Sequence, residues 1–154
     1  MSPPTPDAHG LRVALVAARF NDFIVASLVK GARAAWERHG GAAADLSLVY
    51  VPGAFELPLV VQEVAAKGGI DGVIALGVII QGQTAHAELV ARSVTESLQR
   101  IGLNHRVPVI HEVLLLQNEE QARVRCLEDE LNRGTEAARV AMRMAQVMGD
   151  FARR

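Results

Sequence analysis

The stretch from Gly72 to Ile80 is apolar at every position, and this run limits the folds that the chain can adopt. A strand without polar positions must be covered on both faces, which is typical of a parallel sheet between two layers of helices. Shorter apolar strands and segments with helical periodicity alternate along the rest of the chain. This alternation predicts right-handed parallel crossovers. We therefore expect an α/β protein, a three-layer α/β/α sandwich with a four-stranded parallel sheet.

The expected elements have clear start signals. Strands are predicted at 12–18, 46–51, 72–80 and 107–116, and helices at about 22–39, 55–66, 85–101, 118–130 and 134–151. Asn21 is the expected N-cap of the first helix, and Pro58 lies in the first turn of the second. Asn118 and Gln121 predict a capping-box-like start for the fourth helix. One apolar face is predicted for the last helix: Ala137, Val140, Ala141, Met144, Val147, Met148 and Phe151.

Length and composition exclude several classes of protein. The 154 residues fit one domain at 11–154, preceded by a flexible Pro-rich tail at 1–10. A net charge of −1 gives no bulk attraction to nucleic acid. The single cysteine, Cys126, excludes an internal disulfide and a cysteine cage for a metal, and it fits a reducing compartment. Since no signal peptide or membrane-spanning run is visible, we expect a soluble, cytoplasmic protein without a metal or membrane partner.

The segments that follow the strands are the candidate site, because ligands of open α/β sheets bind at the carboxyl ends of the strands. Phe20 follows the first strand, where its ring suits stacking on a planar heterocycle or, alternatively, a hydrophobic staple beside Asn21. Glu56 follows the tight Pro52-Gly53 turn after the second strand. Its carboxylate suits a polyhydroxylated ligand, although the helix dipole alone also favours it.

The turn after the third strand has features of an anion site. A glycine-led turn that enters a helix offers backbone amides and a positive dipole end, whereas a plain Thr84 N-cap is the simpler alternative. His86 is expected two residues inside this helix, where a histidine suits proton transfer but would more often simply face solvent. Arg125 and Arg133 would add guanidinium groups for a phosphate, although surface arginines are common.

Taken together, these segments resemble the 6,7-dimethyl-8-ribityllumazine synthase family from about residue 13 to 148. The matching pieces are Arg19-Phe20-Asn21, PGAFELP at 52–58, LGVIIQGQTAH at 76–86, Pro108-Val109-Ile110, Glu120-Gln121-Ala122 with Arg125, and Asn132-Arg133-Gly134. The resemblance implies a flavodoxin-like sheet and a transferase that needs no cofactor. In that family 5-amino-6-(D-ribitylamino)uracil condenses with 3,4-dihydroxy-2-butanone 4-phosphate, which releases phosphate and water in the penultimate step of riboflavin synthesis.

For the pyrimidine substrate, the resemblance implies that Phe20 stacks on the ring and that Ala54 and Glu56 hold the ribityl hydroxyl groups. Backbone groups of the third strand would approach the ring; they belong to Val78, Ile79 and Ile80. The other substrate-binding positions expected on this side are Asn21, Gly53, Phe55 and His111.

For the sugar phosphate, the resemblance implies a cradle made by Gly82, Gln83 and Thr84. Arg125 of a neighbouring subunit would pair with the phosphate, and Arg133 keeps the charge of the lysine that is usual at its position. His86 would shuttle protons during imine formation and phosphate elimination. His86 and Arg125 are therefore the expected catalytic residues.

The resemblance also implies a homopentamer, because the last strand and the last two helices would complete the site of a neighbour. Whether pentamers form a decamer or a sixty-subunit shell stays open, and riboflavin synthase is a candidate partner. Ala87 and His111 stand where the family has aromatic residues, and Glu112 would influence His111 if both face the same space. These departures leave a non-catalytic lumazine- or flavin-binding paralogue, or an assembly scaffold, as alternatives. The phosphate clamp favours the enzyme.

Overall fold

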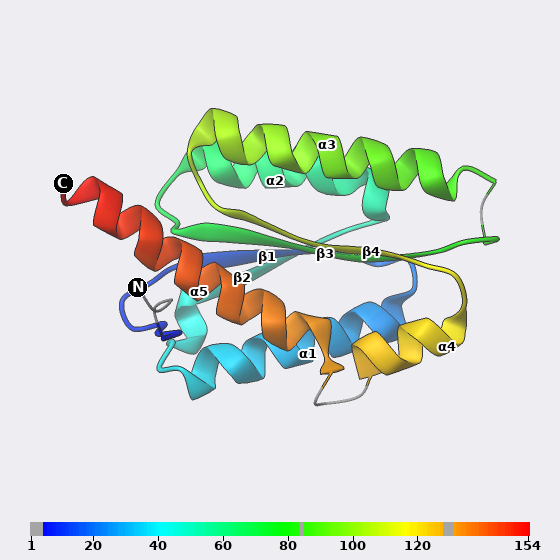
Figure 1. The fold of residues 1–154 in the computed structure, drawn as a ribbon, viewed down its shortest axis with the longest axis horizontal. Coiled ribbons are helices and arrows are strands. Elements are labelled where there is room, and N and C mark those ends of the chain that lie inside the picture. Colours follow the sequence, from blue (N-terminus) through cyan, green and yellow to red (C-terminus); the bar gives the residue numbers. More distant parts are fainter. Residues whose placement is uncertain (1–4, 84, 128–130) are drawn as a thin grey trace.

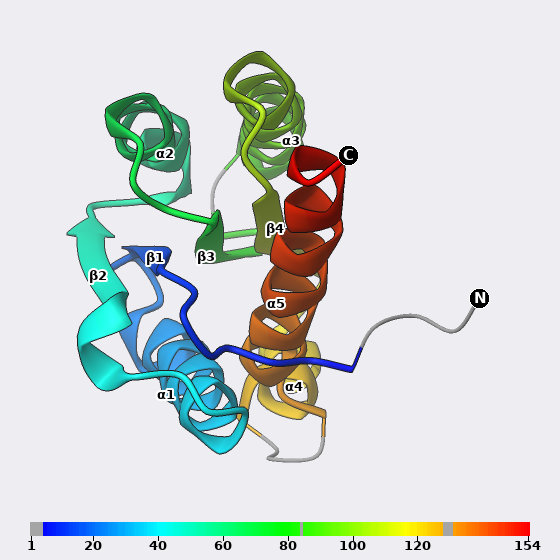
Figure 2. The same ribbon diagram turned by 90° about the vertical axis from the view of Figure 1, so that its left-hand side faces the viewer.

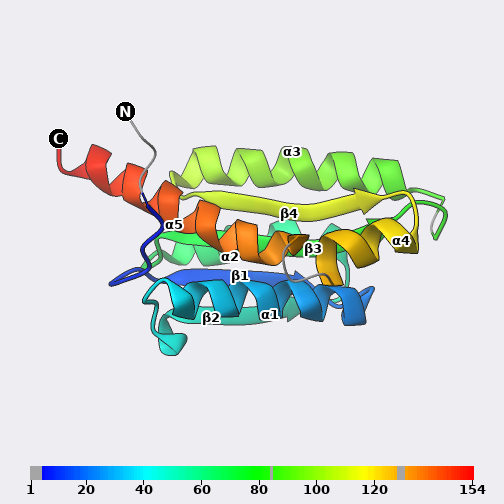
Figure 3. The same ribbon diagram turned by 60° about the horizontal axis from the view of Figure 1, so that its bottom comes forward.

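A four-stranded parallel sheet forms the centre of the protein, in the order β2-β1-β3-β4 (Figures 1 and 3). The computed structural model describes residues 5–83, 85–127 and 131–154. The strands are β1 (Val13–Ala18), β2 (Leu46–Val51), β3 (Gly72–Ile80) and β4 (Val109–Leu116). The two central strands, β1 and β3, are buried at every position. The predicted parallel α/β fold is therefore confirmed.

Helices cover both faces of the sheet, as the view along the strands in Figure 2 shows. One layer contains α2 (Leu57–Lys67) and α3 (Ala87–His105). The other contains α1 (Asp22–Arg38), α5 (Arg133–Ala152), the short α4 (Glu119–Ala122) and a π-helical turn, η3 (Arg123–Leu127). Single turns of 3-10 helix lie at η1 (Ala43–Asp45) and η2 (Ala54–Glu56).

The hydrophobic core is divided by the sheet into two clusters. Leu15 and Ile74 point into the layer of α1 and α5, where they pack with the buried Trp36. Their neighbours Val16 and Ala75 point into the layer of α2 and α3. Successive strand residues alternate between the faces, so any two consecutive side chains of a strand lie in different layers. Among the helices of the described residues, none is long and apolar enough to cross a membrane.

Three local predictions differ in part from the structure. Asn21 is the N-cap residue of α1, as predicted, but its side chain makes no capping hydrogen bond: its backbone is left-handed (φ 65°), and its amide donates to Val78 O instead. The third helix begins at Ala87, so His86 lies at the N-cap position and not inside the helix. The predicted helix at 118–130 is α4 followed by η3, and residues 128–130 lie outside the described part of the chain.

The predicted capping box of α4 is confirmed, except that the side chain of Gln121 bonds to the amide of Gln117 and not to that of Asn118. Asn118 Oδ1 accepts a hydrogen bond from Gln121 N at 2.9 Å, and Gln121 Oε1 accepts one from Gln117 N at 2.9 Å. Within the predicted tail, Ala8 is buried and its amide donates to His39 O at 2.9 Å. The domain boundary at residue 11 stays a prediction.

The last helix, α5, buries a face that shares only Ala137 and Ala141 with the predicted one. Its buried residues are Gly134, Ala137, Ala138, Ala141, Met142 and Ala145. A Cβ on Gly134 would collide with the backbone of Leu28, which shows how closely α5 approaches α1. α5 therefore packs through the face that carries its small residues, because only these allow such a close approach. Met144 and Phe151 lie outside this face and are exposed. The prediction overlooked this because it followed the larger apolar side chains.

Candidate active site

The segments that leave β1, β2 and β3 are joined by hydrogen bonds at one end of the sheet. Arg19 N donates to Val51 O at 2.8 Å, and Phe20 N donates to Pro52 O at 3.0 Å. Asn21 Nδ2 donates to Val78 O at 2.8 Å, which links the exit of β1 to β3. β2 lies on one side of β1, and β3 lies on the opposite side of β1. The strand order therefore reverses direction at β1, and ligands of open α/β sheets bind at such a switch point.

A cavity of about 160 Å³ opens at this switch point. It brings together most of the residues predicted for the pyrimidine side; its lining is Phe20, Gly53, Ala54, Phe55, Glu56, Val78, Ile79, Ile80 and Val90. An apolar cavity of roughly 150 Å³ is enough to hold a benzene ring, so this one has the size of a single six-membered ring. Phe20 and Phe55 are 55% and 64% exposed at its rim, where they offer aromatic faces for stacking.

The carboxylate of Glu56 is held against the wall of this cavity. Glu56 N donates to Gly53 O at 3.2 Å, which closes the single turn η2. A Cβ on Gly53 would lie 3.1 Å from Glu56 Oε2, so the carboxylate rests over the glycine. The backbone of Gly53 is extended (φ −145°), a conformation that any residue can adopt, so only the Glu56 carboxylate would have to move for a side chain at this position. The arrangement presents an acceptor of hydroxyl groups beside the ring-sized cavity.

The turn after β3 differs in part from the expected anion cradle. Gly82 has the left-handed backbone (φ +92°) that glycine tolerates best. Gln83 N donates to Ile80 O at 3.2 Å, so this amide is used within the turn. Thr84 lies outside the described residues. The predicted contribution of free backbone amides from Gln83 is therefore absent in this conformation, whereas the tight glycine turn is present.

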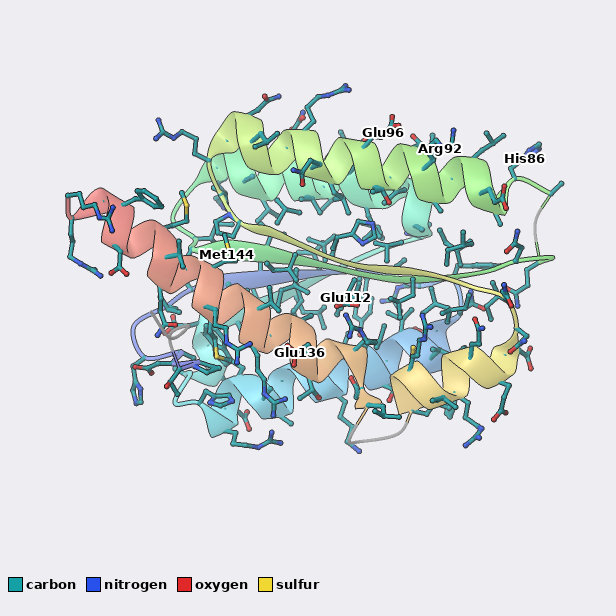
Figure 4. All side chains as sticks on the ribbon, viewed as in Figure 1. His86, Arg92, Glu96, Glu112, Glu136 and Met144 are labelled. Atoms are coloured by element: carbon teal, nitrogen blue, oxygen red, sulfur yellow. The ribbon has the colours of Figure 1, made fainter. Side chains whose placement is uncertain are left out.

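His86 lies at the start of α3, at the positive end of a 19-residue helix (Figure 4). It lines a polar pocket of about 420 Å³ with Gln81, Glu88 and Arg92. Gln81 Nε2 donates to Glu88 Oε1 at 2.9 Å, which ties the turn to the first helical turn. Arg92 is a cation of this pocket that sequence reasoning missed; its position in the second turn of α3, on the helix that follows His86, was the available signal.

The structure does not bring Arg125, Arg133 or His111 to the ring-sized cavity, whose lining residues come from β3 and from the chain segments around β1, β2 and α3. Arg125 is exposed on η3, and Arg133 is the first residue of α5. His111 Nε2 lies 2.8 Å from Thr95 Oγ1 of α3. Within one chain, the predicted site residues therefore lie in several separate places.

Glu112 faces the opposite layer from His111, because consecutive strand residues alternate. Glu112 is only 5% exposed, and its Oε1 accepts a hydrogen bond from Arg133 Nη2 at 3.1 Å. Burial raises the pKa of the Glu112 carboxyl, and the guanidinium of Arg133 opposes this effect. Figure 4 labels Glu112 on the side of the sheet that α1 and α5 cover. The two side chains therefore leave β4 on opposite faces, although both residues line the groove between α3, β4 and α5, and the expected influence of Glu112 on His111 stays a prediction.

Asn132 is buried where α1, η3 and α5 meet. The sequence analysis matched this residue to the family but predicted no role for it. Its Oδ1 accepts from Gly134 N at 2.8 Å and Thr135 N at 3.2 Å, so it caps α5. Its Nδ2 donates to Ser27 O at 3.0 Å and to Cys126 O at 2.8 Å. One side chain thus fixes α1, η3 and α5 relative to each other. Its place immediately before the last helix was the signal for an N-cap.

Two further positions belong to the core. Ala87 is 4% exposed and packs in the cluster of α2 and α3, so a larger ring there would require repacking. Cys126 is fully buried, and its pKa is raised to about 11, mainly by burial. Such a thiol is protonated at neutral pH and is therefore a poor nucleophile. In the described ranges, no group of three or more acidic, histidine or cysteine side chains is placed to hold a metal ion.

Comparisons with known proteins place this geometry in context. The chain is 44% identical over 142 residues to 6,7-dimethyl-8-ribityllumazine synthase of Desulfovibrio desulfuricans, which covers 92% of this chain and 91% of that protein. It is 43% identical over 144 residues to the protein of the same name from Chlorobium limicola, with 94% and 93% coverage. Among solved structures, a de novo designed Rossmann fold protein matches at 21% identity and a TM-score of 0.40, over 73% of this chain and 90% of that one.

The family model described as 6,7-dimethyl-8-ribityllumazine synthase matches residues 10–149, which includes every element of the sheet and all the predicted site residues. Both this match and the two relatives span nearly the whole chain. The chain therefore belongs to the 6,7-dimethyl-8-ribityllumazine synthase family.

Proposed function

We propose that the chain condenses 5-amino-6-(D-ribitylamino)uracil with 3,4-dihydroxy-2-butanone 4-phosphate to 6,7-dimethyl-8-ribityllumazine, with release of phosphate and water. Its family supports this transferase reaction of riboflavin biosynthesis. The observation that carries the proposal is the ring-sized cavity between Phe20, Glu56 and Ile80. Its wall ends at Ile80, where the turn toward His86 begins.

The pyrimidine ring would occupy the cavity, with the exposed face of Phe20 against it. Val78, Ile79 and Ile80 of β3 line the wall, and their backbone groups would pair with the edge of the ring. The carboxylate of Glu56 would accept hydrogen bonds from the ribityl hydroxyl groups. Asn21 does not line the cavity, and we assign it the task of holding β3 in place through Val78 O.

The sugar phosphate would lie between the Gly82 turn and His86, near the positive end of α3. Attack of the amine on the ketone, loss of water to form the imine and elimination of phosphate each require proton transfer. His86 is the group that we assign to this transfer. Holding the two reactants together in a reactive orientation would supply much of the rate.

The site would be completed by a neighbouring copy of the chain. Arg125, Arg133 and His111 lie away from the cavity of their own chain, so they are available to a neighbour. An apolar groove of about 590 Å³ runs between α3, β4 and α5 beside His111, and Met144 and Met148 line it. Apolar side chains of a second copy could fill a groove with this lining. This supports the proposed homopentamer. Assembly with riboflavin synthase and a cytoplasmic location remain part of the proposal.

The test is to incubate the purified protein with both substrates and follow the absorbance of the lumazine product. We expect product and inorganic phosphate to appear in equal amounts, and neither to form when one substrate is omitted. Tight binding of the lumazine without turnover would instead identify a binding paralogue. Neither binding nor turnover would leave only the scaffold alternative. Size determination in solution, by light scattering, checks the oligomer in the same sample.

A further inference from the structure

A single π-helical turn, η3, carries Arg125 beside a buried residue. Cys126 of this turn is fully buried and packs against α1, whereas Arg125 is exposed. Turns of this kind are rare and frequently lie at functional sites. Within residues 5–83, 85–127 and 131–154, no hydrogen bond or ion pair holds the guanidinium of Arg125. The place of this cation therefore depends on how the backbone of η3 is held.

Two side chains donate to one backbone atom of η3, the carbonyl oxygen of Cys126. Ser27 Oγ, from α1, donates at 2.6 Å, and Asn132 Nδ2 donates at 2.8 Å. A carbonyl oxygen has two lone pairs, so both are used. Figures 1 and 3 show the start of α5 beside α1 at this junction. Ser27 thus ties η3 to α1, and Asn132 ties it to the start of α5.

Ser27 makes a contact that α1 itself does not need. A serine inside a helix commonly faces solvent or bonds to the carbonyl group of an earlier turn, at a small cost in helix stability. The hydroxyl group of Ser27 bonds instead to a residue that lies 99 positions later in the chain. One turn further along α1, a Cβ on Gly31 would collide with Asn132 Oδ1 and Thr135 Oγ1. Two positions of α1 are therefore fitted closely to η3 and to the start of α5.

We propose that Ser27 is a positioning residue of the shared site: through the carbonyl group of Cys126, its hydroxyl group holds η3 in the place from which Arg125 reaches a neighbouring copy. This inference rests on the proposed function, in which Arg125 is available to complete the site of a neighbour. Displacement of a functional group by about 1 Å can cost up to about 100-fold in rate, so its support matters. Ser27 does not touch the substrate. Since it acts through Arg125 alone, its effect must disappear when Arg125 is removed.

The kinetic test measures kcat/KM for each substrate in four variants: Ser27→Ala, Ser27→Thr, Arg125→Ala and the double variant Ser27→Ala/Arg125→Ala. Arg125→Ala identifies the substrate whose use depends on Arg125. Ser27→Ala should lower kcat/KM for that substrate about 3- to 10-fold, the loss associated with one hydrogen bond, and leave the other near its wild-type value. Ser27→Thr keeps the hydroxyl group and should stay near wild type for both substrates. In the Arg125→Ala background, Ser27→Ala should cause no further change.

Amide hydrogen exchange provides a readout without turnover. In Ser27→Ala, the peptide of residues 119–127 should exchange faster than in the wild type, because the carbonyl group of Cys126 has lost one donor. Ser27→Thr should keep the wild-type rate. Trp36→Phe is the matched control: it removes the hydrogen bond that Trp36 Nε1 donates to Ala42 O at 2.8 Å, near the other end of α1. This control should change neither the exchange of residues 119–127 nor either kcat/KM.

The results separate the possible failures. If Arg125→Ala lowers kcat/KM for neither substrate, the role of Arg125 in the proposed function is wrong, and the positioning role is lost with it. If Arg125→Ala lowers one kcat/KM but Ser27→Ala lowers neither, lowers both equally, or acts equally with and without Arg125, only the positioning role is overturned. Unchanged exchange of residues 119–127 in Ser27→Ala, or equal losses in Ser27→Thr and Ser27→Ala, would overturn it as well.

Discussion

Asn21 Nδ2 donates a hydrogen bond of 2.8 Å to the carbonyl oxygen of Val78, and this bond joins the exit of β1 to the wall of the ring-sized cavity. The same residue has a left-handed backbone, with φ 65°. Asparagine adopts this conformation more easily than other non-glycine residues do. Two separate properties of Asn21, its amide and its backbone tolerance, therefore shape the pyrimidine side of the site.

Substitution of Asn21 should separate these properties. Asn21→Ala loses the hydrogen bond and places alanine in the left-handed region, for an expected loss of about 1.5–3 kcal/mol in the free energy of unfolding. Asn21→Gly loses only the hydrogen bond and should cost roughly 1 kcal/mol less. Urea unfolding measures both values. Equal losses in the two variants would show that the backbone conformation contributes nothing.

Arg125→Ala should weaken the use of the sugar phosphate far more than that of the pyrimidine. Loss of the charge pair between Arg125 and the phosphate should cost roughly 2–5 kcal/mol of transition-state stabilisation. The measurement is kcat/KM for each substrate. Arg123→Ala is a control in the same π-helical turn, since Arg123 pairs with Glu120 at 2.6 Å. A uniform loss for both substrates would mean that Arg125 is structural.

Mixed oligomers should test whether the site is shared between copies. His86→Ala and Arg125→Ala are each expected to have low activity, because they remove opposite halves of the proposed site. When the two variants are expressed together, some interfaces combine an intact His86 with an intact Arg125. Activity per chain should then exceed that of either variant alone. No gain in co-assembled oligomers would place both residues in the site of a single chain.

The pH dependence of stability should contain a contribution from Glu112. Its pKa is raised above the ordinary value of 4.5, so the folded chain binds this proton more tightly than the unfolded chain does. The free energy of unfolding should therefore fall as the pH rises from about 4.5 through the raised pKa. Glu112→Gln cannot titrate, and the wild type should lose stability relative to it across this range. Denaturant unfolding from about pH 4 to 8 measures the difference, and parallel curves would contradict the prediction.

Asn132→Ala should be among the more destabilising single substitutions. It removes the N-cap of α5 and leaves the carbonyl groups of Ser27 and Cys126 without their amide donor. We expect a loss on the order of 2–4 kcal/mol. Asn132→Asp keeps the cap but not the two donated bonds, so its thermal unfolding should fall between the wild type and the alanine variant. If aspartate and alanine are equally destabilising, the cap contributes little.

The sequence was sufficient for the sheet because its strands are short apolar runs. β3 was predicted with the boundaries that the structure has, since a strand buried on both faces needs apolar residues throughout. The pyrimidine side was also predictable, because the carboxyl ends of parallel strands converge at one edge. The ring-sized cavity there is lined by Phe20 and Glu56, as the position of both after strands suggested.

Other features depend on contacts that no local pattern contains. The start of α3 was predicted two residues too early, because Ala85 and His86 precede the helix and His86 is its N-cap residue. The pairing of Glu112 with Arg133 joins a strand to a helix 21 residues away. The packed face of α5 was misjudged because glycine and alanine, which carry little hydrophobic signal, make the closest contact with α1.

The close approach of α1 and α5 has a consequence for the proposed ring of copies. With backbone in contact at Gly134 and Leu28, there is no layer of side chains to absorb a shift between the helices. α1 begins beside the cavity of one site, and α5 begins at Arg133, which would serve the next. In the proposed ring, α1 and α5 of each chain would then hold two neighbouring sites at a fixed distance from each other. A ligand that displaces the start of either helix would change the spacing in the adjacent site as well.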